Sequence, residues 1–171
     1  MDNEELILLN EILEGKEKRA LIQKELLEKY KNVLISCTLN IPGMYKIKKL
    51  YKKAHTIEVS ALEKQLNDNG INIICKKANI SKAGYETFIV VDCDLKKAKE
   101  ITISIEENNE LGRLFDIDVF DKNQNQLSRC DLGYGKRKCL VCDEDAVICS
   151  RNKTHSVEEV LEKIEKIIKN Y

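Results

Sequence analysis

The chain has 171 residues, of which 43% are hydrophobic and 34% charged, so it can fold as one globular domain with its own core. Its 29 lysines and arginines balance 29 aspartates and glutamates, which argues against broad electrostatic binding to nucleic acid or to an anionic membrane. No segment reaches the roughly 18 apolar residues that a membrane helix needs. Seven cysteines without a framework spacing, and an acidic start without a basic leader, predict reduced thiols and a cytoplasmic protein.

The first segment, residues 1–31, is expected to form two short helices. Apolar residues recur there at three- and four-residue spacing, with charged residues between them, and Gly15 marks the expected break. The apolar positions are Leu6, Leu9 and Leu13 in the first half and Ile22, Leu26 and Tyr30 in the second.

Strand and helix patterns alternate between residues 32 and 120. Strands are expected at 32–41, 71–78, 86–92 and 112–120, with one amphipathic helix ending near 69–70 and another over 95–105. The order strand, helix, strand, strand, helix, strand predicts a ferredoxin-like α+β fold, in which both helices cover one face of an antiparallel sheet. The other face remains free for a site or for the terminal helices.

The last segment, residues 121–171, is expected to extend the same domain. Residues 121–126 (DKNQNQ) predict a hairpin turn, and a cysteine-rich stretch follows. A final helix is expected to begin at Ser156, which forms a capping box with Glu159. Because the chain has one proline and seven glycines, no Pro- or Gly-rich linker divides it, and residues 1–171 are predicted to form a single domain.

The fourth strand carries the pattern that most directly indicates chemistry. Side chains alternate across a strand, so Asp116 and Asp118 share one face while Phe115, Ile117 and Val119 share the other. Two carboxylates about 6–7 Å apart repel each other unless a cation lies between them, and hard divalent cations prefer such oxygen ligands. The alternative is a solvent-exposed edge strand, but aspartate is depleted in strands, and metal binding is therefore the favoured interpretation.

Arginine is concentrated in the last third of the chain, although lysine is the usual basic residue elsewhere. Bidentate recognition of phosphate or carboxylate is typical of arginine. A short basic run, residues 136–138, also follows Gly133 and Gly135, where backbone amides can approach a phosphate. A solvated surface loop is the alternative for the lysines. The four arginines after residue 112 are Arg113, Arg129, Arg137 and Arg151.

Three cysteines and a histidine in the last segment form the pattern C-x₂-C-x₆-C-x₅-H. Their ligand types suit a structural Zn²⁺ ion, but the spacing fits no standard zinc finger. A helix over residues 145–151 would place the third cysteine on a face of its own. We therefore expect that these residues do not converge on one metal, and core cysteines with a phosphate-binding histidine are the favoured interpretation. The residues are Cys139, Cys142, Cys149 and His155.

Several of these motifs, in this order, resemble the citrate lyase holo-acyl-carrier-protein synthases, also described as apo-citrate lyase phosphoribosyl-dephospho-CoA transferases. The resemblance covers nearly the whole chain. The motifs that carry it are Arg19-Ala20-x-Ile22-Gln23, Thr38-Leu39-Asn40-Ile41-Pro42-Gly43, Gly112-Arg113-Leu114-Phe115-Asp116-Ile117-Asp118-Val119, Leu127-Ser128-Arg129, Arg137-Lys138-Cys139-Leu140-x-Cys142, Cys149-Ser150-Arg151 and His155-Ser156.

The resemblance implies transfer of the phosphoribosyl-dephospho-CoA group from 2'-(5''-triphosphoribosyl)-3'-dephospho-CoA to a serine of the citrate lyase acyl-carrier (gamma) subunit, with release of pyrophosphate. The closing strand is also similar to that of hydroxymethylpterin pyrophosphokinase, which is an analogy of fold and not of substrate. The resemblance implies that Asp116 and Asp118 hold Mg²⁺, or Mn²⁺, and act in catalysis together with Arg113. The expected substrate-binding residues are Arg129, Arg137, Arg151, His155, Asn40 and Gly43.

Three questions stay open at the level of sequence. The general base is one of the aspartates, a solvent hydroxide or His155. A pyrophosphokinase that acts on a small metabolite is the competing enzyme, and it would need ATP but no protein acceptor. A zinc-stabilised interaction module that binds a lyase subunit without catalysis is the non-enzymatic alternative.

Overall fold

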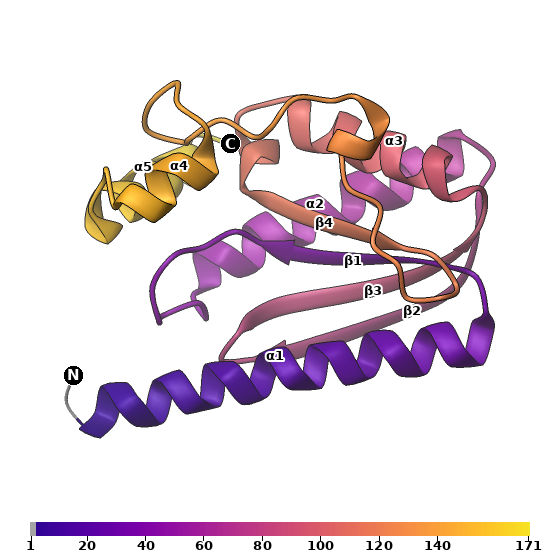
Figure 1. Ribbon diagram of the computed structural model, residues 1–171, viewed down its shortest axis with the longest axis horizontal. Coiled ribbons are helices and arrows are strands. Elements are labelled where there is room, and N and C mark those ends of the chain that lie inside the picture. Colours follow the sequence, from indigo (N-terminus) through magenta and orange to yellow (C-terminus); the bar gives the residue numbers. More distant parts are fainter. Residues whose placement is uncertain (1–2) are drawn as a thin grey trace.

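Four antiparallel strands form the centre of the computed structural model, which describes residues 3–171 (Figure 1). They are β1 (Val33–Leu39), β2 (Asn72–Ser81), β3 (Gly84–Asp92) and β4 (Phe115–Phe120), in the spatial order β2-β3-β1-β4. Helix α2 (Lys49–Asp68) connects β1 to β2, and α3 (Leu95–Glu107) precedes β4. The predicted α+β class, with the order βαββαβ and an antiparallel sheet, is confirmed.

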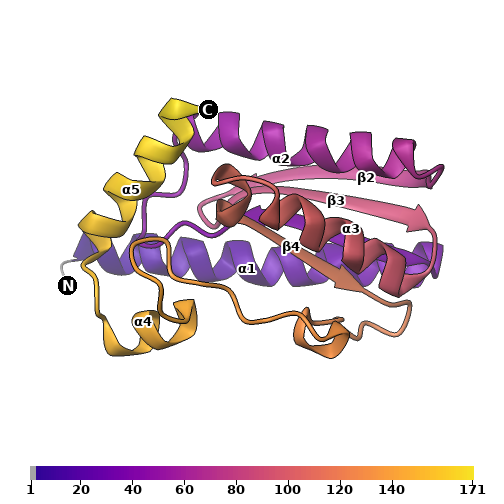
Figure 2. The same ribbon diagram turned by 90° about the horizontal axis from the view of Figure 1, so that it is seen from above.

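The main core lies between the sheet and the helices α2 and α3, which both cover one face of the sheet (Figure 2). The alternation of β4 is as predicted, because Phe115, Ile117 and Val119 are buried in this core. Strand β1 is buried on both faces, because it lies between β3 and β4 in the sheet and both of its faces are covered.

The N-terminal segment forms one helix, α1 (Asn3–Tyr30), and not the two short helices expected from the sequence. It runs along the opposite face of the sheet (Figure 1), where Ile22, Leu26 and Leu27 pack in a second apolar cluster. Gly15 is buried inside this helix and does not break it. A Cβ atom there would lie 2.5 Å from Ser81 Oγ, so the glycine allows the helix to approach the β2–β3 hairpin closely.

A 3₁₀ turn, η1 (Leu111–Leu114), replaces the first three residues of the strand predicted over 112–120. Gly112 permits this turn, because a Cβ at this position would collide with the backbone carbonyl oxygens of Ile105 and Glu106 at the end of α3. The chain is therefore held against α3 before it can extend into β4. Arg113 consequently lies on the turn, at the end of the strand that carries the two aspartates.

The last segment folds back along the edge of β4 toward the opposite end of the sheet (Figures 1 and 2). It contains η2 (Cys130–Leu132), α4 (Ala146–Asn152) and α5 (Val157–Asn170). The turn over 121–126 leads only to an isolated bridge between Phe120 and Gln126. Ser156 caps α5 as predicted, since its hydroxyl accepts a hydrogen bond from the Glu159 amide. Among residues 3–171, no helix has the length and hydropathy needed to cross a membrane.

Candidate active site

A cavity of about 780 Å³ lies between the loop after β1, the end of α3 and the folded-back C-terminal segment. Its volume is within the range of small-molecule sites. Six cationic side chains line it against two acidic ones, so its charge favours an anionic ligand. The cations are Arg113, Arg129, Lys136, Arg137, Lys138 and Lys153, and the acidic residues are Glu106 and Glu107.

Five of the residues predicted to bind substrate or to act in catalysis line this cavity, namely Asn40, Arg113, Arg129, Arg137 and His155. Two others do not. Arg151 is exposed on α4. Gly43 lies next to the cavity wall, since a Cβ added at this glycine would be 3.3 Å from Cγ1 of Val157, which lines the cavity.

Asp116 and Asp118 lie together on the face of β4 that is turned toward α1, outside the residues that line the cavity. On β1 their neighbours are Thr38, opposite Asp116, and Ser36, opposite Asp118. The Thr38 hydroxyl donates to the Asp116 backbone carbonyl at 3.2 Å, and Gln126 Nε2 donates to Asp118 Oδ1 at 2.5 Å. The predicted alternation of β4 is therefore confirmed, since the two carboxylates lie on the face opposite to the buried apolar side chains.

Burial, and then the negative charge of Asp116, raise the pKa of the Asp118 carboxyl. Both causes disfavour the ionised form, and a cation between the two carboxylates would relieve the second. This pair of hard oxygen ligands suits Mg²⁺, which binds to few protein carboxylates and completes its coordination with water and substrate phosphates. The residues present thus fit the metal that the resemblance implies.

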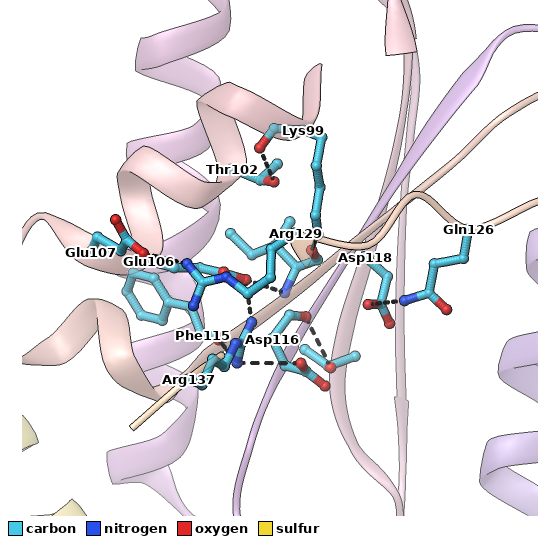
Figure 3. Close-up of polar contacts among 12 residues, drawn as sticks. Lys99, Thr102, Glu106, Glu107, Phe115, Asp116, Asp118, Gln126, Arg129 and Arg137 are labelled. Atoms are coloured by element: carbon cyan, nitrogen blue, oxygen red, sulfur yellow. Dashed lines mark hydrogen bonds and ion pairs between the residues drawn. The ribbon is translucent and has the colours of Figure 1, made fainter. Parts of the chain in front are cut away.

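Arg137 connects the aspartate face to the cavity (Figure 3). Its Nη1 donates to the Phe115 carbonyl at 2.9 Å and lies 3.5 Å from Asp116 Oδ1, while its Nη2 pairs with Glu106 Oε1. Glu106 in turn accepts a hydrogen bond at 3.1 Å from the Ile117 amide. One guanidinium therefore touches the strand, a buried carboxylate and the candidate metal ligand.

Lys99 and Glu106 on α3 complete this network and were missed by the sequence analysis. Lys99 Nζ donates to the Ile117 carbonyl at 3.0 Å, so these side chains satisfy the backbone at the outer edge of β4 (Figure 3). Burial lowers the pKa of the Lys99 ammonium and raises that of the Glu106 carboxyl. The sequence did carry a sign of their role. Lys99 and Glu106 are seven positions apart, which is two helical turns, so both lie on the same side of α3.

The other two arginines are held in place by groups at the cavity wall. Arg113 Nη2 donates to the Cys139 carbonyl, and Arg129 Nη2 pairs with Glu107. The Arg129 Nε atom is buried without a protein partner, which leaves one donor available. These contacts orient both guanidinium groups, as bidentate recognition of phosphate requires.

Helix α1 adds polar groups to the aspartate face. Gln23 Nε2 donates to Ser36 Oγ at 3.0 Å, and Arg19 Nε pairs with the buried Glu86 carboxylate at 2.6 Å. Arg19 also opposes the rise in the pKa of Asp118. Both α1 residues belong to the motif Arg19-Ala20-x-Ile22-Gln23, for which the sequence analysis predicted no role at the site.

The cysteine and histidine side chains of the last segment converge, contrary to expectation. The ligand atoms of Cys139, Cys142, Cys149 and His155 all lie within 4.8 Å of one another. Helix α4 is present over 146–152, but the loop before it turns back and brings the first two thiols to Cys149. Helix periodicity alone could not show this, because the loop determines where the partners lie.

The fold and this site define a class, namely α+β proteins with a basic cavity beside a pair of strand carboxylates, an arrangement suited to a multiply phosphorylated ligand. The chain belongs to the family described as apo-citrate lyase phosphoribosyl-dephospho-CoA transferase, which it matches over residues 7–171.

Curated relatives cover nearly all of the chain. A "probable apo-citrate lyase phosphoribosyl-dephospho-CoA transferase" of Vibrio cholerae is 32% identical over 166 residues, which are 96% of this chain and 93% of that protein. One of Streptococcus pyogenes serotype M18 is 33% identical over 172 residues, covering 98% and 88%. "Protein CitXG" of Haemophilus influenzae is 34% identical over 168 residues, and the chain spans only 36% of its length.

Proposed function

We propose that the protein transfers the phosphoribosyl-dephospho-CoA group from 2'-(5''-triphosphoribosyl)-3'-dephospho-CoA to a serine of the citrate lyase acyl-carrier subunit. The observation that carries this proposal is the family match over residues 7–171. The basic cavity beside Asp116 and Asp118 supports it, because the donor substrate has a triphosphate that needs such a site.

The reaction needs the donor's α-phosphorus close to the carrier serine. The serine oxygen attacks that phosphorus, the bond from the α-phosphorus to the bridging oxygen breaks, and pyrophosphate leaves with the electron pair. Arg113, Arg129 and Arg137 line the cavity and are the groups to bind the triphosphate and neutralise the charge on pyrophosphate. Because such transfers depend on positioning and charge, fixed arginines supply most of what the chain must contribute.

Asp116 and Asp118 are the residues that would hold Mg²⁺, or Mn²⁺ in its place. When bound, the ion neutralises phosphate charge and helps to orient the donor. Arg137 touches Asp116 and lines the cavity, so it is the side chain that aligns the triphosphate with the carboxylates.

The proton of the carrier serine must pass to a base. Both ring nitrogens of His155 are engaged inside the protein, with Cys142 Sγ at 3.2 Å and Glu159 Oε2 at 3.4 Å. This arrangement disfavours His155 as the base, and an aspartate or a solvent hydroxide remains for the role. We also assign the reaction to the cytoplasm, the compartment expected for a chain whose seven cysteines lack a disulfide-framework spacing.

The test is incubation of the purified protein with the apo carrier subunit, synthetic 2'-(5''-triphosphoribosyl)-3'-dephospho-CoA and Mg²⁺, followed by intact-mass measurement of the carrier. The carrier should gain the mass of one phosphoribosyl-dephospho-CoA group, and one pyrophosphate should be released per carrier. A carrier with alanine at the acceptor serine is the control. An unmodified carrier, or transfer that requires ATP as donor, would contradict the proposal.

A further inference from the structure

We propose that Cys139, Cys142, Cys149 and His155 bind one Zn²⁺ ion, which fixes the C-terminal segment as a wall of the cavity. The Sγ atoms of Cys142 and Cys149 are 3.4 Å apart, and His155 Nε2 lies 3.2 Å from Cys142 Sγ. All four ligand atoms lie within 4.8 Å of one another. A tetrahedral zinc ion with bonds of about 2.3 Å to sulfur holds its sulfur ligands roughly 3.8 Å apart, so only small shifts are needed.

The first two thiols are presented by a short hairpin. The Cys139 amide donates to the Glu144 carbonyl at 2.8 Å, and the Ala146 amide donates to the Arg137 carbonyl at 2.9 Å. The turn between them directs Cys139 and Cys142 to the same side, and the Val141 amide points to Cys139 Sγ at 3.5 Å. Amide groups directed at sulfur stabilise thiolates, which are the form that binds zinc.

The remaining two ligands come from α4 and from the residue before the cap of α5. The Thr154 amide donates to the Cys149 carbonyl at 3.1 Å, and this contact turns the chain so that His155 faces the thiols. His155 Nε2 points to the sulfur cluster, while Nδ1 lies 3.4 Å from Glu159 Oε2. A carboxylate on the far nitrogen is the usual arrangement for a histidine that ligates zinc, because it fixes the ring and its tautomer.

Neither a disulfide nor simple core packing explains why all four side chains of the cluster converge. A disulfide between Cys142 and Cys149 would give no role to Cys139 and His155. Core packing accounts for buried Cys139 and Cys149, but not for a histidine whose second nitrogen has a carboxylate partner. Four protein ligands also leave no open position, so the geometry indicates a structural metal that does not take part in the chemistry.

The cluster forms part of the cavity wall, because Cys139, Cys149 and His155 all line the cavity. Arg113 Nη2 donates to the carbonyl of Cys139, and Lys136, Arg137 and Lys138 precede that residue in the chain. A zinc ion would therefore hold the basic wall of the cavity at a defined position relative to η1 and the end of α3. This role is separate from Mg²⁺ binding at the aspartates.

The first experiment measures metal in the wild-type protein, purified with reduced thiols and without chelator. Elemental analysis should find one zinc per chain that survives desalting, and a mercurial reagent that blocks thiols should release it. Cobalt exchanged into the site should give the intense thiolate-to-cobalt absorption of a tetrahedral centre. Zinc well below one per chain, iron in its place, or a Cys142–Cys149 disulfide in protein whose thiols were trapped at lysis would overturn the proposal.

The second experiment compares Cys142→Ser with Cys130→Ser, since Cys130 is exposed and lies outside the cluster. The Cys142 variant should lose its zinc and unfold at a lower temperature, and the Cys130 variant should keep both properties. If the Cys142 variant does not fold, the wild-type metal and cobalt measurements still decide. Asp118→Asn should retain its zinc, so failure of the zinc proposal and failure of the proposed function are distinguishable. A Cys142 variant that keeps a full zinc content would refute the ligand assignment.

Discussion

Replacing Arg137 by glutamine tests whether the network at the edge of β4 is the part of the fold that holds the site. Glutamine is shorter and uncharged, so the variant loses the charged hydrogen bond to the Phe115 carbonyl and the ion pair with Glu106. Glu106 has a side-chain exposure of 4% and would keep only the Ile117 amide as a donor. The change leaves a buried carboxylate without its charge partner.

The expected decrease in the free energy of unfolding follows from the solvent exposure of the two side chains. Removing one partner of a fully buried pair costs about 3–5 kcal/mol. The Arg137 side chain is 29% exposed, so solvent already screens the pair, and we expect the free energy of unfolding to fall by about 2 kcal/mol. Asp116 adds little to this figure, because its side chain is 44% exposed.

The loss should depend on pH. Burial raises the pKa of Glu106 in the folded protein, and Arg137 opposes that shift. The Glu106 carboxyl therefore keeps its proton to a higher pH in the folded state than in the unfolded state. The free energy of unfolding falls as the pH rises from about 4.3, the ordinary pKa of glutamate, through the pKa of Glu106 in the folded protein. Without Arg137 that window widens, so the deficit of the variant should be larger at about pH 8 than at about pH 5.

Urea unfolding of a double-mutant cycle measures this coupling. Glu106→Gln removes the buried charge but keeps an oxygen for the Ile117 amide, so the double variant should recover much of the stability that Arg137→Gln loses. It should not recover transfer activity if Arg137 binds the triphosphate. Arg151→Gln, on the exposed surface of α4, is the stability control. Additive effects of the two substitutions, or no loss in Arg137→Gln, would refute the reasoning.

Three further variants test separate parts of the structure. Arg113→Ala should lower carrier modification about 10²–10³-fold with the fold intact, and near-normal turnover would show that this arginine is surface charge alone. Gly15→Val should lower the free energy of unfolding by about 1–3 kcal/mol, because its side chain collides with Ser81, and an unchanged urea midpoint would disprove that contact. Ser156→Ala should cost about 1 kcal/mol in the same assay by removing the cap on the Glu159 amide, and a loss below a few tenths would show that the cap contributes little.

The sheet and the aspartate face could be predicted because they depend on local alternation. Phe115 and Ile117 are buried and Asp116 lies on the opposite face, as the period of two requires. The glycines could not be read in the same way. Gly15 and Gly112 both allow close approach to another element of the fold. From the sequence alone, however, Gly15 is indistinguishable from a helix break and Gly112 from an ordinary strand start.

The cysteine cluster, and the network of Lys99, Glu106 and Arg137 at the outer edge of β4, could be predicted only with knowledge of the tertiary structure. Cys142 reaches Cys149 because backbone hydrogen bonds close the hairpin over 137–146, and no helix or strand period encodes that loop. Glu106 and Lys99 lie seven positions apart on α3, but their partner is the free edge of β4, which appears only once the strand order is known.

The most direct test of the central claim is the Mg²⁺ dependence of carrier modification by Asp118→Asn and Asp116→Asn. Each variant keeps the size of the side chain and removes one charge, and Asp68→Asn at the exposed end of α2 is the matched control. We predict that both variants fold normally, lose most of the transfer rate and need higher Mg²⁺ for the remainder, while the control behaves like the wild type. A folded Asp118→Asn protein that modifies the carrier serine at the wild-type rate in low Mg²⁺ would contradict the assignment of the aspartates as the metal ligands of the transfer reaction.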